Sequence, residues 1–115
     1  MNLVRANEGS EYSAPGHFGG VFVSKHGKDL PGNKHLAVSV STFEPGGGCD
    51  YLEFPEDWPL DLCYYLLEGE LKVTTKNGET FVFKAGDTVL WTGGDARGFI
   101  NETDKPAKLL VIIAQ

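Results

Sequence analysis

The chain has 115 residues, 15 of them glycine, and its 16 acidic residues outnumber 10 basic ones, so the formal net charge is −6 at pH 7. This length suits a single domain, and an acidic chain with no run of basic residues disfavours binding to nucleic acid or to an anionic membrane surface. No segment has the apolar core of a signal peptide or the roughly 20 apolar residues that cross a bilayer. We therefore expect a soluble, cytoplasmic protein.

Short runs rich in β-branched and aromatic residues follow one another from residue 20 onward, separated by turns rich in glycine. This spacing is typical of an antiparallel sandwich or barrel, and no amphipathic helix of credible length competes. We predict one all-β barrel domain over residues 20–115, preceded by an arm or edge strand at residues 1–19. The predicted strands are Val21–Ser24, Leu36–Phe43, Tyr51–Phe54, Leu62–Leu67, Leu71–Thr75, Thr80–Phe83, Thr88–Thr92, Gly98–Ile100 and Lys108–Ile113.

Two local patterns refine this prediction. The pair Asn77-Gly78 suits a type I′ turn and predicts a hairpin between the strands on either side of it. The strands at residues 62–67 and 108–113 are apolar on both faces. One face fills the barrel, and the other must be covered by a second sheet or a second subunit, so we expect a homodimer.

The segment from Gly86 to Asn101 resembles the second motif of the cupin superfamily, G-x5-P-x-G-x2-H-x3-N, with its spacing matched throughout. Gly94 also holds its place, whereas Thr92 stands where the family has Pro and Arg97 where it has its metal-binding His. The run YYLLEGELKV at residues 64–73 is similar to the end of the first motif, H-x-H-x3-4-E-x6-G.

This resemblance covers about residues 36–113 and implies a double-stranded β-helix, the cupin or jelly-roll barrel, of six to eight strands. The segment FPEDWPL at residues 54–60 resembles more narrowly the single-domain cupins of ethanolamine utilisation.

The resemblance also locates the family's metal ligands, and the usual residues are missing there. Counting back from Gly69, the glutamate ligand falls on Leu62, and the histidine pair falls on Glu56 and Trp58, or on Pro55 and Asp57 with the longer spacing. A guanidinium cannot deprotonate and repels a cation, so Arg97 makes a metal site in the usual place improbable. We expect no metal cofactor.

Arg97 is one of only two arginines, the other being Arg5 in the arm. A guanidinium can receive the carboxylate or phosphate of a small ligand through paired hydrogen bonds. The alternative is a structural salt bridge to Asp95 or to a carboxylate at a strand end. If Arg97 points into the barrel, it needs an anionic partner, which is either a ligand or one of Glu53, Glu56, Asp57 and Asp61.

Five carboxylates fall within twelve residues, at Asp50, Glu53, Glu56, Asp57 and Asp61. They form a solvated loop, or one or two of them pair with Arg97 as a general acid or base. A third possibility makes Asp57, Asp61 and His35 oxygen and nitrogen ligands of a hard cation.

The candidate ligand-binding residues gather around Arg97. Strand parity places Leu62 and Tyr64 on one face, which the resemblance turns into the barrel, so Tyr64 is a better pocket residue than Tyr65. The aromatic residues Tyr51, Trp58, Tyr64, Tyr65, Trp91 and Phe99 are core or line a pocket for a planar or acyl ligand. The full set of candidates is Arg97, Tyr64, Leu62, Phe99, Trp58, Glu53 and His35.

Three functions remain open. The first is a metal-independent barrel that binds a small anionic or aromatic metabolite, with lyase, isomerase or cyclase chemistry by proton transfer if it is an enzyme. The second is a metal-dependent dioxygenase or isomerase with unusual ligands from the acidic loop and His35. The third is a non-catalytic accessory subunit, which a barrel filled entirely by side chains would favour.

Overall fold

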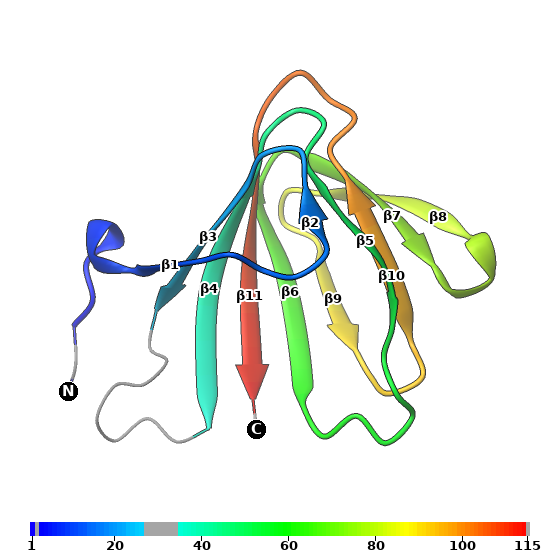
Figure 1. Ribbon diagram of the computed structural model, residues 1–115, viewed down its shortest axis with the longest axis horizontal. Helices are drawn as coiled ribbons and strands as arrows, with labels where there is room; N and C mark the ends of the chain where they lie inside the picture. The colour runs from blue at the N-terminus through cyan, green and yellow to red at the C-terminus, as the bar shows by residue number, and fades with distance from the viewer. Residues whose placement is uncertain (2, 27–34, 115) are drawn as a thin grey trace.

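The computed structural model describes residues 1, 3–26 and 35–114, and in it two antiparallel sheets face each other as a barrel (Figure 1). No helix in the described part of the chain has the length and apolar character needed to span a membrane. The elements in chain order are η1 Ala6–Glu8, β1 Ser10–Tyr12, β2 His17–Phe18, β3 Val21–His26, β4 Leu36–Phe43, β5 Gly48–Glu53, β6 Asp61–Glu68, β7 Glu70–Thr75, η2 Lys76–Gly78, β8 Thr80–Lys84, β9 Thr88–Trp91, β10 Ala96–Ile100 and β11 Ala107–Ala114.

The larger sheet has the strand order β1-β3-β4-β11-β6-β9, and the smaller has the order β2-β5-β10-β7-β8. All nine predicted strands are present with small shifts of their ends, which confirms the all-β jelly-roll prediction. The arm adds β1 to the edge of the larger sheet beside β3 and β2 to the edge of the smaller sheet beside β5. Neither short strand buries a side chain completely, so no apolar alternation marked it in the sequence.

Alternate residues of each strand face the interior. Along β6, Leu62, Tyr64 and Leu66 are buried while Tyr65 and Leu67 are exposed, so the predicted parity is confirmed. The densest part of the core is built from side chains of both sheets that exclude water almost completely, namely Phe43, Leu66, Leu71, Val73, Phe83 and Leu109.

The barrel is closed at one end and more open at the other. The interior-facing residues of β11 go from 0% and 2% exposed at Ala107 and Leu109 to partly exposed at Val111 and Ile113. On the neighbouring β4, the exposure of the interior-facing residues increases toward the same end, from buried Phe43 to half-buried Ser39. The open end is therefore the one at which β11 ends and the β5–β6 and β9–β10 loops turn (Figure 1).

The structure explains why two positions of the chain hold asparagine. Asn101 is buried beyond β10, where its amide donates to the carbonyls of Phe43 at 3.0 Å and Lys105 at 2.7 Å and its carbonyl accepts from Thr103. It therefore fixes the β10–β11 loop at the closed end. The predicted β7–β8 hairpin is also present, and its Asn77 takes a positive φ of 70°, as an Asn-Gly turn requires.

Candidate functional site

Arg97 lies on the interior wall near the open end. On β10 it pairs with Thr75 of β7 and Leu52 of β5, and a register shift between Arg97 and Phe99 separates the two residues in the β5 pairing. The side chain is only 9% exposed. Its Cζ lies 5.6 Å from the ring centroid of Phe54 and 5.5 Å from that of Phe99, so the guanidinium rests against two aromatic rings.

No carboxylate of the described residues neutralises this charge within salt-bridge distance. Among the described residues, Nη1 of the guanidinium donates to the backbone carbonyl of Asp50 at the long distance of 3.4 Å, and the hydroxyl of Tyr64 also interacts with the Arg97 side chain, whereas Nε is buried without any acceptor. Asp95, the expected alternative partner, instead accepts from the backbone and hydroxyl of Thr92 at 2.8 and 3.1 Å. Arg97 is thus a buried cation without a counter-ion among the described residues.

A group of aromatic side chains surrounds Arg97, and we call Phe54, Trp58, Tyr64, Trp91 and Phe99 the aromatic cup. Ring centroids within the cup are 5.2 Å apart for Phe54–Trp58, 5.8 Å for Tyr64–Trp91 and 5.6 Å for Tyr64–Phe99. The rings come from β6, β9, β10 and the segment after β5, so both sheets and a loop at the open end contribute.

Two further groups beside Arg97 can exchange protons. Burial raises the pKa of Tyr64, while the charge of Arg97 and a hydrogen bond with its side chain act in the opposite direction. Burial likewise raises the pKa of the Cys49 thiol, and the charge of Arg97 again opposes the shift. Both groups therefore stay protonated near neutral pH and can act as hydrogen-bond donors toward an acceptor in the cup.

The structure brings Arg97, Tyr64, Phe99 and Trp58 together, and it places Leu62 opposite Trp91 in the β6–β9 pairing. The other two candidates, Glu53 and His35, lie elsewhere. Both are exposed, and the Glu53 carboxylate accepts a hydrogen bond from the hydroxyl of Tyr51 at 3.0 Å, so it is not the partner of Arg97.

The sequence did not single out Phe54 and Cys49 as site residues. Phe54 contacts Arg97 and both tryptophans, although in the sequence it is only the last residue of a predicted strand. The signal that points to it is its place before Pro55, where an extended strand must give way to a turn. Cys49 faces inward because it pairs with Phe99 across β5 and β10.

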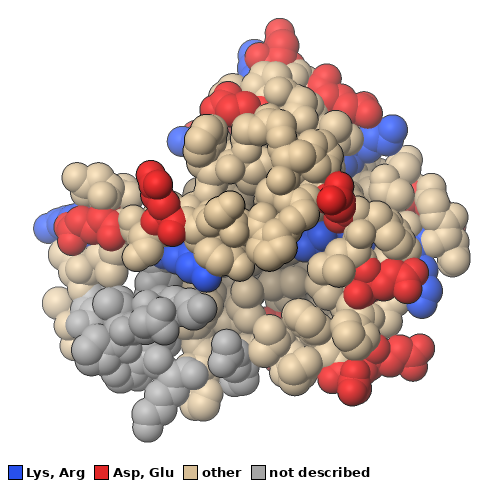
Figure 2. All heavy atoms as spheres, in the orientation of Figure 1, with Lys and Arg blue, Asp and Glu red and all other residues tan. Residues whose placement is uncertain are grey.

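All five carboxylates of the predicted acidic loop are exposed, but only Glu56 and Asp57 lie in a loop, since Asp50 and Glu53 belong to β5 and Asp61 to β6. Figure 2 shows acidic side chains along the margin of the molecule on the side of the β5–β6 loop (lower right). Within the described residues, no three side chains of His, Cys, Asp or Glu converge as metal ligands would. The family's metal position itself holds buried Leu62 and the guanidinium of Arg97, and a hydrocarbon and a cation do not fit a divalent metal.

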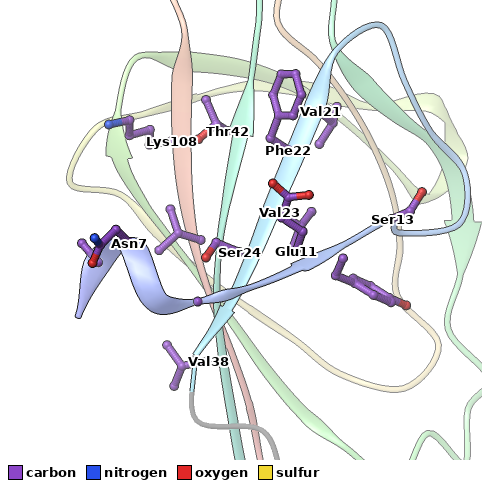
Figure 3. Close-up of a pocket in the computed structure, with 14 residues that line it drawn as sticks. Asn7, Glu11, Ser13, Val21, Phe22, Val23, Ser24, Val38, Thr42 and Lys108 are labelled. Atoms are coloured by element: carbon purple, nitrogen blue, oxygen red, sulfur yellow. The ribbon is translucent and has the colours of Figure 1, made fainter. Parts of the chain in front are cut away.

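A separate pocket of about 980 Å³ lies away from Arg97, outside the barrel. Figure 3 shows it between the arm, which carries Asn7 and Glu11, and the strands that carry Phe22, Thr42 and Lys108.

Comparisons with known proteins agree with this architecture. A family model described as "Cupin domain" matches residues 39–113. Beta-D-galactosidase Rv1717 of Mycobacterium tuberculosis is 32% identical over 114 residues, which cover 99% of this chain and 94% of that protein.

Two solved structures are similar in fold. The polyketide cyclase RemF from Streptomyces resistomycificus superposes with a TM-score of 0.83 at 19% identity, covering 99% of this chain and 79% of that one. A predicted oxalate decarboxylase from Thermotoga maritima gives 0.79 at 22% identity and covers 98% of both chains. At these identities, the two structures show a shared fold.

Proposed function

The chain belongs to the cupin family, and we propose that its barrel binds a small anionic metabolite without a metal ion, with Arg97 holding the anion. The observation that supports this most strongly is the buried guanidinium of Arg97, which has no carboxylate partner among the described residues. A ligand anion is the counter-ion that such a group lacks.

The energetics favour this assignment. Burying a charged group without a partner costs several kcal/mol even after the protein relaxes. The two ring contacts of Arg97 return only about 0.5–2 kcal/mol each, and the long bond to the Asp50 carbonyl adds little. A carboxylate or phosphate accepts two parallel hydrogen bonds from a guanidinium and offsets the remaining cost.

The proton chemistry of the cup is that of an acid. Tyr64 and Cys49 both have a raised pKa, and no carboxylate or imidazole lies among the described residues of the cup. Tyr64 therefore stays protonated and can donate a hydrogen bond to a bound molecule, whereas no group of the cup is poised to remove a proton. Lyase, isomerase or cyclase chemistry in this barrel would use Tyr64 to polarise the bound molecule.

The experiment is calorimetric titration of small carboxylates and inorganic phosphate into the wild type, Arg97→Ala and Arg5→Ala. We expect at least one carboxylate to bind the wild type, Arg97→Ala to lose that binding, and Arg5→Ala to retain it, because Arg5 is exposed in the arm. Unchanged affinity of Arg97→Ala for a confirmed ligand would remove Arg97 from this role.

A second candidate function is the processing of a β-galactoside, which the name of the 32% identical relative suggests. Most glycosidases use a pair of carboxylates, and the β5–β6 loop at the open end carries two exposed ones, Glu56 and Asp57. Hydrolysis of a chromogenic β-galactoside that survives Arg97→Ala but not Glu56→Gln or Asp57→Asn would favour this function over anion binding.

A homodimer remains part of the proposal. The outer face of the larger sheet exposes apolar side chains that would normally be covered, such as Phe22 at 65% and Leu90 at 72%. Light scattering after gel filtration measures the mass in solution, and we expect Leu90→Glu to shift a dimer of the wild type toward the monomer.

A further inference from the structure

Three buried nitrogen donors, one on Arg97 and two in the aromatic cup, lack an acceptor among the described residues. They are Nε of Arg97 and Nε1 of Trp58 and of Trp91. All three side chains contact the ring of Phe54, whose centroid lies 5.6 Å from Cζ of Arg97 and 5.2 and 6.2 Å from the ring centroids of Trp58 and Trp91. Because native proteins pair nearly all buried donors, three unpaired ones around a single ring indicate a missing partner.

The missing partner must supply acceptors. The indole nitrogens of Trp58 and Trp91 donate only, and so does the guanidinium of Arg97. Of the carboxylates at this end of the barrel, those of β5, β6 and the loop between them are exposed, Asp95 accepts from Thr92, and Tyr64 already interacts with Arg97. A ligand that satisfies the cup therefore carries an anionic group for Arg97 and further oxygen acceptors for the two indole N–H groups.

The shape of the cup restricts the ligand further. The ring planes meet at 39° for Phe54–Trp58, 58° for Phe54–Trp91 and 80° for Trp91–Phe99. Since no two of these rings are parallel, they offer no slot in which a flat aromatic ligand stacks face to face with both. Tilted rings suit a puckered ring, whose C–H groups lie against the aromatic faces while its oxygens project from the edge toward the indole nitrogens.

We propose, building on the proposed anion binding at Arg97, that the ligand is an acidic monosaccharide, whose carboxylate pairs with Arg97 and whose hydroxyl oxygens accept from the indole N–H groups of Trp58 and Trp91. A neutral sugar leaves the guanidinium without a counter-ion. An aromatic acid leaves the two indole donors unpaired.

Binding also requires side chains to move, because the three nitrogens have no solvent contact in the structure. Trp58 is the member of the cup placed to do so, since it lies in the loop between β5 and β6 at the open end and is only partly buried. The chain contains two tryptophans, Trp58 and Trp91, and both belong to the cup. Tryptophan fluorescence therefore reports on the cup alone.

The test compares three probes, D-galacturonate, D-galactose and benzoate, by calorimetry and by tryptophan fluorescence. We expect galacturonate to bind the wild type at least about tenfold more tightly than either other probe, since each of them leaves buried donors unpaired. Galacturonate should also change the fluorescence, and Arg97→Met should abolish both responses.

The variants Trp58→Phe and Trp91→Phe remove one donor each and retain an aromatic ring. Each should weaken galacturonate about tenfold and leave benzoate within about twofold. Tyr65→Phe is the matched control, because it removes a donor from an exposed ring on the outer face and should change neither affinity. Circular dichroism and the urea midpoint verify that each variant is folded.

The outcomes separate this inference from the proposed function. If galacturonate and benzoate bind equally through Arg97 and the tryptophan variants change neither, the sugar is overturned and anion binding stands. If galactose binds as tightly as galacturonate and independently of Arg97, the acidic sugar is overturned and anion binding fails with it. The comparison of probes on the wild type decides the ligand class even if a tryptophan variant does not fold.

Discussion

Replacing Arg97 with methionine should make the ligand-free protein more stable. Methionine retains the length and the apolar stem of the side chain but removes a charge that is 9% exposed and has no counter-ion among the described residues. The substitution also removes the stabilising interactions of the guanidinium, which are its packing against two aromatic rings, a hydrogen bond of 3.4 Å to the Asp50 carbonyl and a hydrogen bond with Tyr64.

The expected change in the free energy of unfolding is the burial cost of the charge minus the stabilisation that its contacts return. The burial cost of an unpaired ion is several kcal/mol, and the ring contacts together return about 1–4 kcal/mol. We expect the free energy of unfolding of Arg97→Met to rise by about 1–2 kcal/mol, which raises the melting temperature by about 4 °C per kcal/mol in a domain of this size.

Urea unfolding followed by tryptophan fluorescence, together with calorimetric melting, measures this change. Arg5→Met is the control, and it should alter stability by no more than about 0.5 kcal/mol because Arg5 is exposed. A saturating ligand should stabilise the wild type and not Arg97→Met. A decrease of about 1 kcal/mol or more in the stability of ligand-free Arg97→Met would refute the reasoning, since it would show that the guanidinium is already satisfied in the free protein.

Three other predictions concern the fold and its titrating groups. Gly69→Ala should destabilise the protein by more than about 2 kcal/mol in urea unfolding, because Gly69 has a φ of +78° and a Cβ there would lie 2.7 Å from a backbone carbonyl oxygen. Gly78→Ala, at a φ of +76° with open space around it, should cost only about 1 kcal/mol. Equal losses of stability in the two variants would contradict this prediction. The raised pKa values of Tyr64 and Cys49 mean that the folded state holds both protons more tightly than the unfolded state. The free energy of unfolding should therefore be constant below about pH 9 and decline as the pH rises further. In urea titrations at several pH values, Tyr64→Phe should remove part of this decline. An aromatic disulfide reagent should modify half-buried Cys63 readily and buried Cys49 only after denaturant is added; two equally fast thiols would count against the burial of Cys49.

The strands, and which residues of a strand share a face, follow from local patterns. A period of two residues places Leu62 and Tyr64 on the same side of β6 wherever the strand lies, and Asn77-Gly78 favours a turn whatever surrounds it. This period, together with the cupin resemblance that turns the Leu62 face into the barrel, separated Tyr64 from Tyr65. The sequence left residues 1–19 as an arm or an edge strand and did not locate β1 and β2, because these strands are held by backbone pairing to a sheet edge and bury little apolar surface.

The state of Arg97 depends on contacts between distant segments. Its neighbours Phe54 and Phe99 reach it only through the pairing of β10 with β5, and the register shift in that pairing is not visible in either strand alone. For the same reason, the sequence made Glu53 a candidate partner, whereas the fold turns its carboxylate to Tyr51.

The sequence by itself determined that this is an acidic cupin barrel with an arginine in place of a metal ligand, because spacing, turns and residue types are properties of neighbouring positions. Only the tertiary structure decided that this arginine is buried without a carboxylate partner among the described residues and that Phe54 joins it to two unpaired tryptophan donors. Whether a buried polar group is satisfied depends on every chain segment packed around it, and those segments are brought together only when the sheets close.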